Sequence, residues 1–181
     1  MPKRILLQFD TDPRASTFDA VVAVDAGADV LLSHGGVTAG NVVPLVHGAM
    51  FTRGGADLAG TAIFVGGSDV TAAEDVCAAV RKAFFGPVRV SVLLDPSGAN
   101  TTAAAAVVAA GRHLPLADHQ ALIEAVVLGG TGPVGQRVTR LLAGRGAGVT
   151  VVSRSLDRAR EVCERVRAKV PQARLQAIQA D

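Results

Sequence analysis

The amino-acid sequence predicts an α/β protein with parallel sheets, organised as two domains. Short apolar segments of strand length alternate with longer helical segments along the whole chain, which is typical of βαβ units. Glycine-containing turns separate these segments, and the 181 residues are enough for two small domains. Hydrophobic residues make up 49% of the chain, which is a large supply of core side chains.

The first domain is expected over residues 1–112, as an α/β unit with a parallel sheet. Ser16 and Asp19 have the spacing of a capping box, and Asn41 is a second candidate N-cap. Residues 100–111 are rich in alanine, the strongest helix former, and predict a long helix. Strands are expected at 5–9, 29–32, 61–65 and 88–94, with helices that open near Ser16, Asn41, Thr71 and Asn100.

The second domain is expected over residues 120–181. An apolar run at 125–128 reads as a buried parallel strand, and it is followed by Gly130-x-Gly132-x-x-Gly135 and then by an amphipathic helical segment. A strand, a glycine turn and a helix in this order are typical of a Rossmann-type dinucleotide site. A purely structural turn is the alternative interpretation.

Each glycine of this motif has an expected role. Gly130 would allow the tight turn, Gly132 the approach of the backbone to a pyrophosphate, and Gly135 the close packing of the helix on the strand. The phosphates would lie at the helix N-terminus, where unpaired N–H groups and the helix dipole favour negative charge. The expected cofactor-binding residues of the turn are Gly130, Thr131, Gly132, Pro133, Val134 and Gly135.

The end of the next strand, at 149–152, indicates which dinucleotide is bound. NAD-binding sites usually have an acid about 20 residues past the glycines, and no acid stands there. Ser153 and Ser155 can donate hydrogen bonds to a phosphate, Arg154 can pair with it as a fork, and Arg158 lies one turn into the following helix. The sequence therefore favours NADP over NAD as the cofactor. A basic, solvated loop is the alternative interpretation.

The second domain has fewer predicted strands than a complete dinucleotide-binding fold. After the strand at 149–152 come a charged helix from Leu156 to about Lys169 and the start of a third strand at 174–178. A doubly wound sheet usually has about six strands. We therefore expect the chain to be a fragment of a longer protein, with an incomplete Rossmann-type domain.

Composition and spacing argue against several function classes. The formal net charge is +2 at pH 7, Trp and Tyr are absent and Phe occurs six times, so no nucleic-acid partner is expected. No run approaches about 18 apolar residues, so no membrane span is expected. The four histidines show no metal-ligand spacing, and no metal site is expected. Cys77 and Cys163 are expected to be reduced, buried thiols, which indicates a cytoplasmic protein.

Several short motifs follow one another along nearly the whole chain. They are Gln8-Phe-Asp-Thr-Asp12, Phe18-Asp19, Thr52-Arg-Gly-Gly55, Thr61-Ala-Ile-Phe-Val-Gly-Gly67, Phe84-Phe-Gly-Pro87, Asn100-Thr-Thr102 and Gly130-Thr-Gly-Pro-Val-Gly135. Together they are far more specific than the glycine motif alone. Through them the chain resembles the NADP-dependent methylene-tetrahydromethanopterin dehydrogenases of one-carbon-oxidising bacteria. The C-terminal part of that family has no counterpart in this sequence.

The resemblance implies an oxidoreductase of one-carbon metabolism. In this reaction the methylene bridge of the reduced pterin gives a hydride to NADP and becomes a methenyl cation. The resemblance also implies a pterin as small-molecule substrate and a homotrimer, and the Ala-rich, apolar helices favour a homo-oligomer as well. Two other functions stay open: an NAD(P) oxidoreductase that acts on another substrate, for instance on folate-bound methylene groups, and a non-catalytic nucleotide-binding protein.

Carboxylates at strand ends are the candidate catalytic groups. No proton moves in the hydride step, so catalysis can depend on positioning and on negative potential near the developing cation. Ligands of parallel sheets bind beyond the carboxyl ends of the strands, and three aspartates follow predicted strands there. We expect Asp95 to be catalytic, and the substrate-binding residues to be Asp10, Asp12, Ser97, Asn100 and Thr102.

Each of these residues also has a purely structural interpretation. Asp10 and Asp12 then form an Asx turn before Pro13, and residues 95–98 form an ordinary β-turn. Asn100 is, in the same way, a candidate N-cap of the Ala-rich helix. These alternatives stay open at the level of the sequence.

Overall fold

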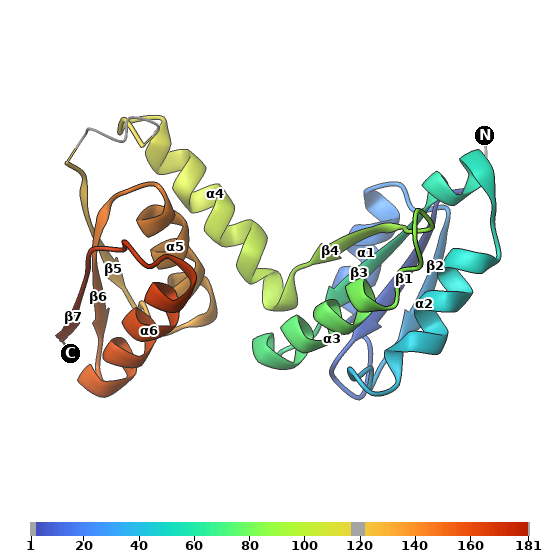
Figure 1. Cartoon of the computed structure of the whole chain (residues 1–181), viewed down its shortest axis with the longest axis horizontal. Coiled ribbons are helices and arrows are strands. Elements are labelled where there is room, and N and C mark those ends of the chain that lie inside the picture. Colours follow the sequence, from blue (N-terminus) through green and yellow to red (C-terminus); the bar gives the residue numbers. More distant parts are fainter. Residues whose placement is uncertain (1–2, 117–121, 181) are drawn as a thin grey trace. The chain divides into compact units, whose positions relative to one another are not determined.

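The computed structural model describes residues 3–116 and 122–180. It divides the chain into two compact units between Ser97 and Gly98. Each unit contains its own parallel sheet and its own hydrophobic core (Figure 1). The predicted fold class, α/β with parallel sheets, is therefore confirmed.

Unit 1 is built on a four-stranded parallel sheet with the strand order β2-β1-β3-β4. Strand β1 is central: its Phe9 is opposite His34 of β2 on one side and opposite Val65 of β3 on the other. The elements of unit 1 are, in chain order, β1 (Ile5–Asp10), α1 (Thr17–Asp25), β2 (Val30–His34), α2 (Val42–Phe51), the 3-10 helix η1 (Gly55–Gly60), β3 (Thr61–Gly66), α3 (Val70–Lys82), β4 (Ser91–Leu94) and the 3-10 turn η2 (Pro96–Gly98).

The two faces of this sheet are covered differently. Leu7, Phe9 and Ile63 are buried in one cluster with the inner sides of α2 and α3, because alternate residues of a strand share a face. On the other face, the Gln8 side chain donates a hydrogen bond of 3.0 Å from Nε2 to the Ser16 carbonyl. Helix α1, which begins directly after Ser16, contributes no buried side chain.

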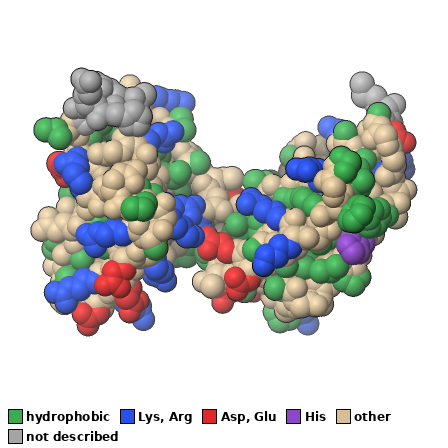
Figure 2. All heavy atoms as spheres, in the orientation of Figure 1, with side chains coloured by type: hydrophobic (Ala, Val, Ile, Leu, Met, Phe, Trp, Pro, Cys, Tyr) green, Lys and Arg blue, Asp and Glu red, His purple; other side chains and the backbone are tan. Residues whose placement is uncertain are grey.

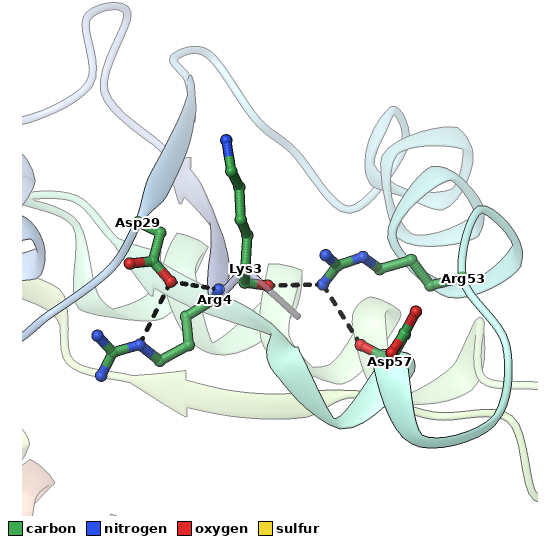
Figure 3. Close-up of polar contacts among 5 residues, drawn as sticks. All are labelled: Lys3, Arg4, Asp29, Arg53 and Asp57. Atoms are coloured by element: carbon green, nitrogen blue, oxygen red, sulfur yellow. Dashed lines mark hydrogen bonds and ion pairs between the residues drawn. The ribbon is translucent and has the colours of Figure 1, made fainter. Parts of the chain in front are cut away.

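Polar contacts fix the amino-terminal end of β1 to its neighbours (Figure 3). The Arg4 backbone N–H donates to Asp29 Oδ2 at 2.7 Å, and this bond, more than any other contact, lowers the pKa of the Asp29 carboxyl. Arg53 of the segment after α2 donates from Nη1 to the carbonyls of Lys3, at 2.9 Å, and Asp57, at 3.3 Å. These contacts are exposed, so each is expected to add little to the stability of the unit.

Unit 2 is built on a three-stranded parallel sheet with the order β5-β6-β7. Leu128 of β5 is opposite Val152 of β6, and Val152 is opposite Ile178 of β7. This order is the one found in the first three strands of a doubly wound sheet, so the arrangement is partly Rossmann-like. The elements of unit 2 are α4 (Ala99–Gly111), β5 (Glu124–Leu128), α5 (Pro133–Gly144), β6 (Gly148–Ser153), α6 (Leu156–Lys169) and β7 (Leu175–Gln179).

The core of unit 2 lies between its sheet and its helices. Val149 and Val151 of β6 are buried in one cluster with Leu142 of α5 and with Val162 and Cys163 of α6. Burial raises the pKa of the Cys163 thiol, which disfavours the reactive thiolate. Cys77 of α3 is also free and buried, so the expected burial of both cysteines is confirmed.

Most predicted elements are present, within a few residues of the expected bounds. Ser16 is the N-cap of α1, and its Oγ accepts from the Asp19 N–H at 3.2 Å. Asn41 precedes α2 without a side-chain bond to that helix. The predicted strand 88–94 begins only at Ser91, because Gly86 has a positive φ of 55° and Val88 turns back to form a bridge with Phe85.

The boundary between the compact units differs from the expected one. We expected residues 1–112 to form the first domain, but α4 packs against α5 and so belongs to unit 2. The expected start of the second domain at residue 120 lies outside the described residues. The roles assigned to the two domains stay predictions. Within the described residues, no helix is both long and apolar enough to cross a membrane.

Candidate functional site

The glycine turn after β5 is tightly packed. Gly129 adopts the left-handed conformation with φ of 64°, and the Gly130 N–H donates to the Val152 carbonyl at 3.0 Å. A Cβ on Gly130 would lie 2.6 Å from Val151 Cγ1. The expectation for Gly130 therefore needs a correction: Gly129 provides the tight turn, and Gly130 is required because β6 leaves no room for a side chain.

The second and third glycines of the motif have different surroundings. Gly132 is extended, and a Cβ there would approach only the Gly129 carbonyl oxygen, at 3.4 Å. A Cβ on Gly135 would lie 2.6 Å from the same oxygen and 2.8 Å from Gly130 Cα. Gly135 thus permits the close approach of α5 to the glycine turn, whereas we expected it to permit the packing of the helix on the strand. Gly132 leaves the backbone accessible.

The first turn of α5 has the properties of an anion-binding site. Pro133 occupies its first position, where the missing N–H costs no helical hydrogen bond. The N–H groups of Val134 and Gly135 lie in the first turn, where a helix provides no acceptor for them, and the helix dipole adds positive potential. Gln136 Nε2 donates to the Thr131 carbonyl at 2.7 Å and holds the turn in place. The turn can therefore hold a phosphate.

The end of β6 lies beside this turn. The hydroxyl oxygens of Ser153 and Thr131 are 3.2 Å apart, and Ser153 Oγ also accepts from the Ser155 N–H at 3.3 Å. Ser155 is the N-cap of α6, where its Oγ accepts from the Arg158 N–H at 3.4 Å. Arg154 is exposed. The residues predicted to contact the cofactor thus form one continuous region of unit 2, and their binding role stays a prediction.

Arg137 is a buried charge that the sequence analysis missed. Its side chain is 5% exposed, Nη1 donates to the Pro133 carbonyl at 3.2 Å, and Nε donates to Asn100 Oδ1. Asn100 therefore connects α4 to α5, and it is not the N-cap of α4, a position that Gly98 takes with φ of 62°. Thr102 lies in the first turn of α4. No spacing in the sequence distinguishes Arg137 from the exposed arginines of the helices.

The carboxylates predicted for the substrate site lie at the carboxyl end of the sheet of unit 1. Asp10 ends β1 and is 1% exposed, and Asp95 follows β4 and is 8% exposed. Asp10 accepts from the Asp12 N–H at 2.9 Å and from the Ser16 N–H at 2.8 Å, which is the Asx turn of the alternative interpretation. Asp10 therefore has a structural role in this turn. The negative charge of its carboxylate also agrees with a role near the substrate.

Two other predicted substrate contacts connect loops at the same end of the sheet. Asp12 accepts from the Ser68 N–H at 3.0 Å and from the Ser68 hydroxyl at 2.7 Å. Ser97 donates from Oγ to the Gly67 carbonyl at 3.3 Å and has a positive φ of 52°, which is uncommon for a residue with a side chain. Such backbone strain clusters at functional sites, and it places Ser97 among the residues to test.

Asp19 is a third carboxylate at this end of the sheet, which the sequence analysis used only as a capping residue. Burial raises the pKa of its carboxyl, the hydrogen bond with Ser16 lowers it, and the negative charges of Asp10 and Asp95 raise it further. The three carboxylates are therefore close enough to interact. Their combined negative potential can stabilise a cation that develops beside them. No cluster of metal-ligating side chains occurs among the residues described.

Exchanging Asp19 for asparagine is expected to raise the thermal midpoint at pH 7. The pKa of Asp19 is raised in the folded protein, so the folded state holds this proton more tightly than the unfolded chain. This contribution to stability is complete below the unfolded pKa and is lost as the pH rises through the folded pKa. The advantage of Asp19→Asn should therefore shrink as the pH is lowered from about 7 to about 4.

Thermal melts followed by circular dichroism measure this difference. Asp75→Asn, at an exposed position in the middle of α3, is a matched control and should leave the midpoint nearly unchanged at both pH values. A midpoint of Asp19→Asn at or below that of the unaltered protein at pH 7 would contradict the account of the carboxylate cluster.

The fold and the site define a class of protein. A parallel α/β unit with strand-end carboxylates is followed in the chain by a glycine turn and helix of the dinucleotide-binding type. A family model described as methylene-tetrahydromethanopterin dehydrogenase, N-terminal, matches residues 17–97, which lie in unit 1. Unit 1 therefore contains an N-terminal domain of the methylene-tetrahydromethanopterin dehydrogenase family.

Two proteins of Methylorubrum extorquens are similar to this chain. One is named bifunctional protein MdtA and is 49% identical over 170 residues, which are 92% of this chain and 57% of that protein. The other is named NAD(P)-dependent methylenetetrahydromethanopterin dehydrogenase and is 36% identical over 114 residues, which are 63% of this chain and 38% of that protein. The chain thus spans little more than half the length of the first relative.

Proposed function

We propose that this protein oxidises methylene-tetrahydromethanopterin to methenyl-tetrahydromethanopterin by hydride transfer to NADP. The observation that carries the proposal is the match of unit 1 to the N-terminal domain of these dehydrogenases, in a chain that continues into a dinucleotide-type turn. The second relative, which is named for this substrate and for NAD(P), supports the same reaction. The proposal assigns pterin binding to unit 1 and cofactor binding to unit 2.

The chemistry of the substrate suits the residues of unit 1. The carbon that loses the hydride lies between two nitrogens, whose lone pairs spread the positive charge that remains. No base is needed, so the carboxylates act through their charge and through positioning. We assign the electrostatic role to Asp95, with Asp10 and Asp19 adding to the potential and with Asp12 and Ser97 as contacts of the pterin. Asn100 and Thr102, the other predicted contacts, lie in unit 2.

The residues of unit 2 fit a dinucleotide phosphate. The accessible backbone at Gly132 and the first turn of α5 provide space and N–H donors for the pyrophosphate. Ser153, Ser155, Arg154 and Arg158 provide hydrogen bonds and positive charge for a ribose phosphate, and no acid stands at the end of β6 to bind ribose hydroxyls. When bound, NADP would supply the hydride acceptor. These features favour NADP over NAD, and we propose that the enzyme acts as a cytoplasmic homo-oligomer, with trimers implied by the resemblance.

Replacing Arg154 with alanine is expected to weaken NADP binding by about tenfold to a hundredfold, because a charge-assisted hydrogen bond to the ribose phosphate is lost. NAD has no such phosphate, so its affinity should stay unchanged. Calorimetric titration of both nucleotides measures the two affinities. Arg145→Ala, at the far end of α5, is the matched control.

The same titration tests the cofactor assignment of the unaltered protein. Tighter binding of NADP than of NAD supports the proposal. Equal affinity of the unaltered protein for the two nucleotides would contradict the role given to the segment after β6. An Arg154→Ala variant that loses affinity for NADP and NAD to the same extent would contradict it as well.

A further inference from the structure

Arg137 of α5 differs from the other arginines of unit 2 because it is buried. Its side chain is 5% exposed, and it is the only buried arginine among the described residues of this unit. Figure 2 shows Lys and Arg side chains spread over the visible surface of unit 2, on the left of the view. Removing a guanidinium from water costs free energy, so the burial of Arg137 calls for an explanation that solubility does not provide.

The Arg137 side chain reaches back along α5 to the start of the helix. Long side chains of a helix point toward its N-terminus, and Arg137 Nη1 donates to the Pro133 carbonyl at 3.2 Å. Arg137 Nε donates to Asn100 Oδ1 of α4, the helix that packs against α5. Both acceptors are neutral oxygens, so these two bonds hold the guanidinium at the first turn without cancelling its charge.

The first turn of a helix is an unfavourable place for a positive charge. The helix dipole already gives this end a partial positive charge, which disfavours a cation and favours an anion. An anion bound at the first turn of α5 would be attracted both by the helix dipole and by the Arg137 guanidinium. The position of Arg137 therefore favours the helix with a negative ligand over the helix without one.

Arg137 also contacts the peptide group that carries one donor of the proposed phosphate site. The Pro133 carbonyl and the Val134 N–H belong to the same planar peptide group. A guanidinium that donates to the carbonyl oxygen polarises this group, and the Val134 N–H becomes a stronger donor as a result. The bond from Arg137 to Pro133 also limits the rotation of the peptide group, which fixes the direction of this N–H.

We propose that Arg137 is a positioning residue for the pyrophosphate of the dinucleotide. It orients the peptide group of the Val134 N–H and raises the positive potential at the first turn of α5, and it acts through this turn without touching the ligand. The inference rests on the proposed function, in which α5 binds the phosphates of NADP. Because NADP and NAD share the pyrophosphate, Arg137 serves both nucleotides, whereas Arg154 serves only NADP.

Removal of the charge tests this role. Arg137→Met keeps an unbranched side chain of similar length, and it is expected to weaken the binding of NADP and of NAD by the same factor, at least about tenfold. Adenosine 2′-phosphate carries the ribose phosphate of NADP without the pyrophosphate, so its affinity should stay unchanged. Calorimetric titration measures the two dinucleotides, and competition with NADP measures the mononucleotide. Arg145→Met, at the exposed end of α5, is the matched control and should bind all three ligands normally.

Two further variants separate the charge of Arg137 from its packing. Arg137→Lys keeps the charge and is expected to bind both dinucleotides more tightly than Arg137→Met does. Asn100→Asp keeps an oxygen that accepts from Arg137 Nε and adds a negative charge beside the guanidinium. It is expected to weaken the binding of NADP and NAD while the midpoint of urea unfolding stays near that of the unaltered protein.

The outcomes distinguish this inference from the proposed function. Normal dinucleotide binding by Arg137→Met would overturn the role of Arg137 and leave the cofactor assignment intact. The electrostatic role would also be overturned if Arg137→Lys bound no better than Arg137→Met and Asn100→Asp bound normally, because Arg137 would then act through packing alone. An unaltered protein that binds neither NADP nor NAD would contradict the proposed function itself, and this inference with it.

Discussion

Replacing Gly135 with alanine is expected to destabilise unit 2 by about 1–3 kcal/mol, which is typical of a methyl group forced into a packed site. The new Cβ would lie 2.6 Å from the Gly129 carbonyl oxygen and 2.8 Å from Gly130 Cα. Both contacts are with backbone, so the first turn of α5 must move away from the glycine turn. Since the proposed phosphate site is formed by these two segments, NADP binding should be lost together with stability.

Substitutions at two other glycines distinguish the effect of steric strain from the effect of losing the binding site. A Cβ on Gly132 has only one contact, at 3.4 Å, so Gly132→Ala is expected to keep the stability of unit 2 and to weaken NADP binding. Gly144 lies in the last turn of α5 with nothing within 4 Å, and Gly144→Ala should stabilise the helix by about 0.5–1 kcal/mol without affecting NADP.

Urea unfolding and calorimetric titration with NADP measure these three variants. A Gly135→Ala variant as stable as the unaltered protein would contradict the packing described for the turn. Unchanged NADP affinity in Gly132→Ala would contradict the placement of the pyrophosphate, because the backbone there would not approach the ligand.

The second large effect is expected at Asp95. Asp95→Asn preserves the shape of the side chain and removes its charge, so the developing methenyl cation loses electrostatic stabilisation. Removal of one preorganised electrostatic partner typically lowers kcat about a hundredfold or more. The affinity for NADP should be unchanged, because we assign the cofactor to unit 2. Steady-state kinetics with methylene-tetrahydromethanopterin and titration with NADP measure the two quantities separately.

Asp57→Asn provides the control for Asp95. Asp57 is exposed in η1, near the amino-terminal end of the sheet of unit 1, and its removal should leave kcat unchanged. An Asp95→Asn variant with the turnover of the unaltered protein would remove Asp95 from the mechanism. Positioning of the two reactants would then be the main contribution to catalysis.

The sequence predicted well those features that depend on local chemistry. Alternating apolar and helical segments predicted the strands and helices, and α6 has the expected bounds, Leu156–Lys169. The spacing of Ser16 and Asp19 predicted the cap of α1, because capping depends on residues three apart. The close packing at Gly135 followed from the glycine motif, in which each position has a steric reason.

Features that depend on tertiary contacts were not predictable in the same way. The position of the positive φ at Gly129 depends on how β5 ends, and the late start of β4 depends on the turn at Gly86. The assignment of α4 to unit 2 depends on its packing against α5. Asp19 joins Asp10 and Asp95 only in the folded protein, and the spacing of these residues in the sequence gives no sign of it.

The most direct test of the proposed function is the reduction of NADP by this protein with methylene-tetrahydromethanopterin as the hydride donor. Parallel reactions replace NADP with NAD, and methylene-tetrahydromethanopterin with methylene-tetrahydrofolate. We expect NADPH to form with NADP and the methanopterin substrate. NADH formation with NAD as the acceptor, and NADPH formation with the folate, are both expected to be slower. Absence of NADPH formation with methylene-tetrahydromethanopterin, or faster turnover of the folate, would contradict the activity that we assign to the protein.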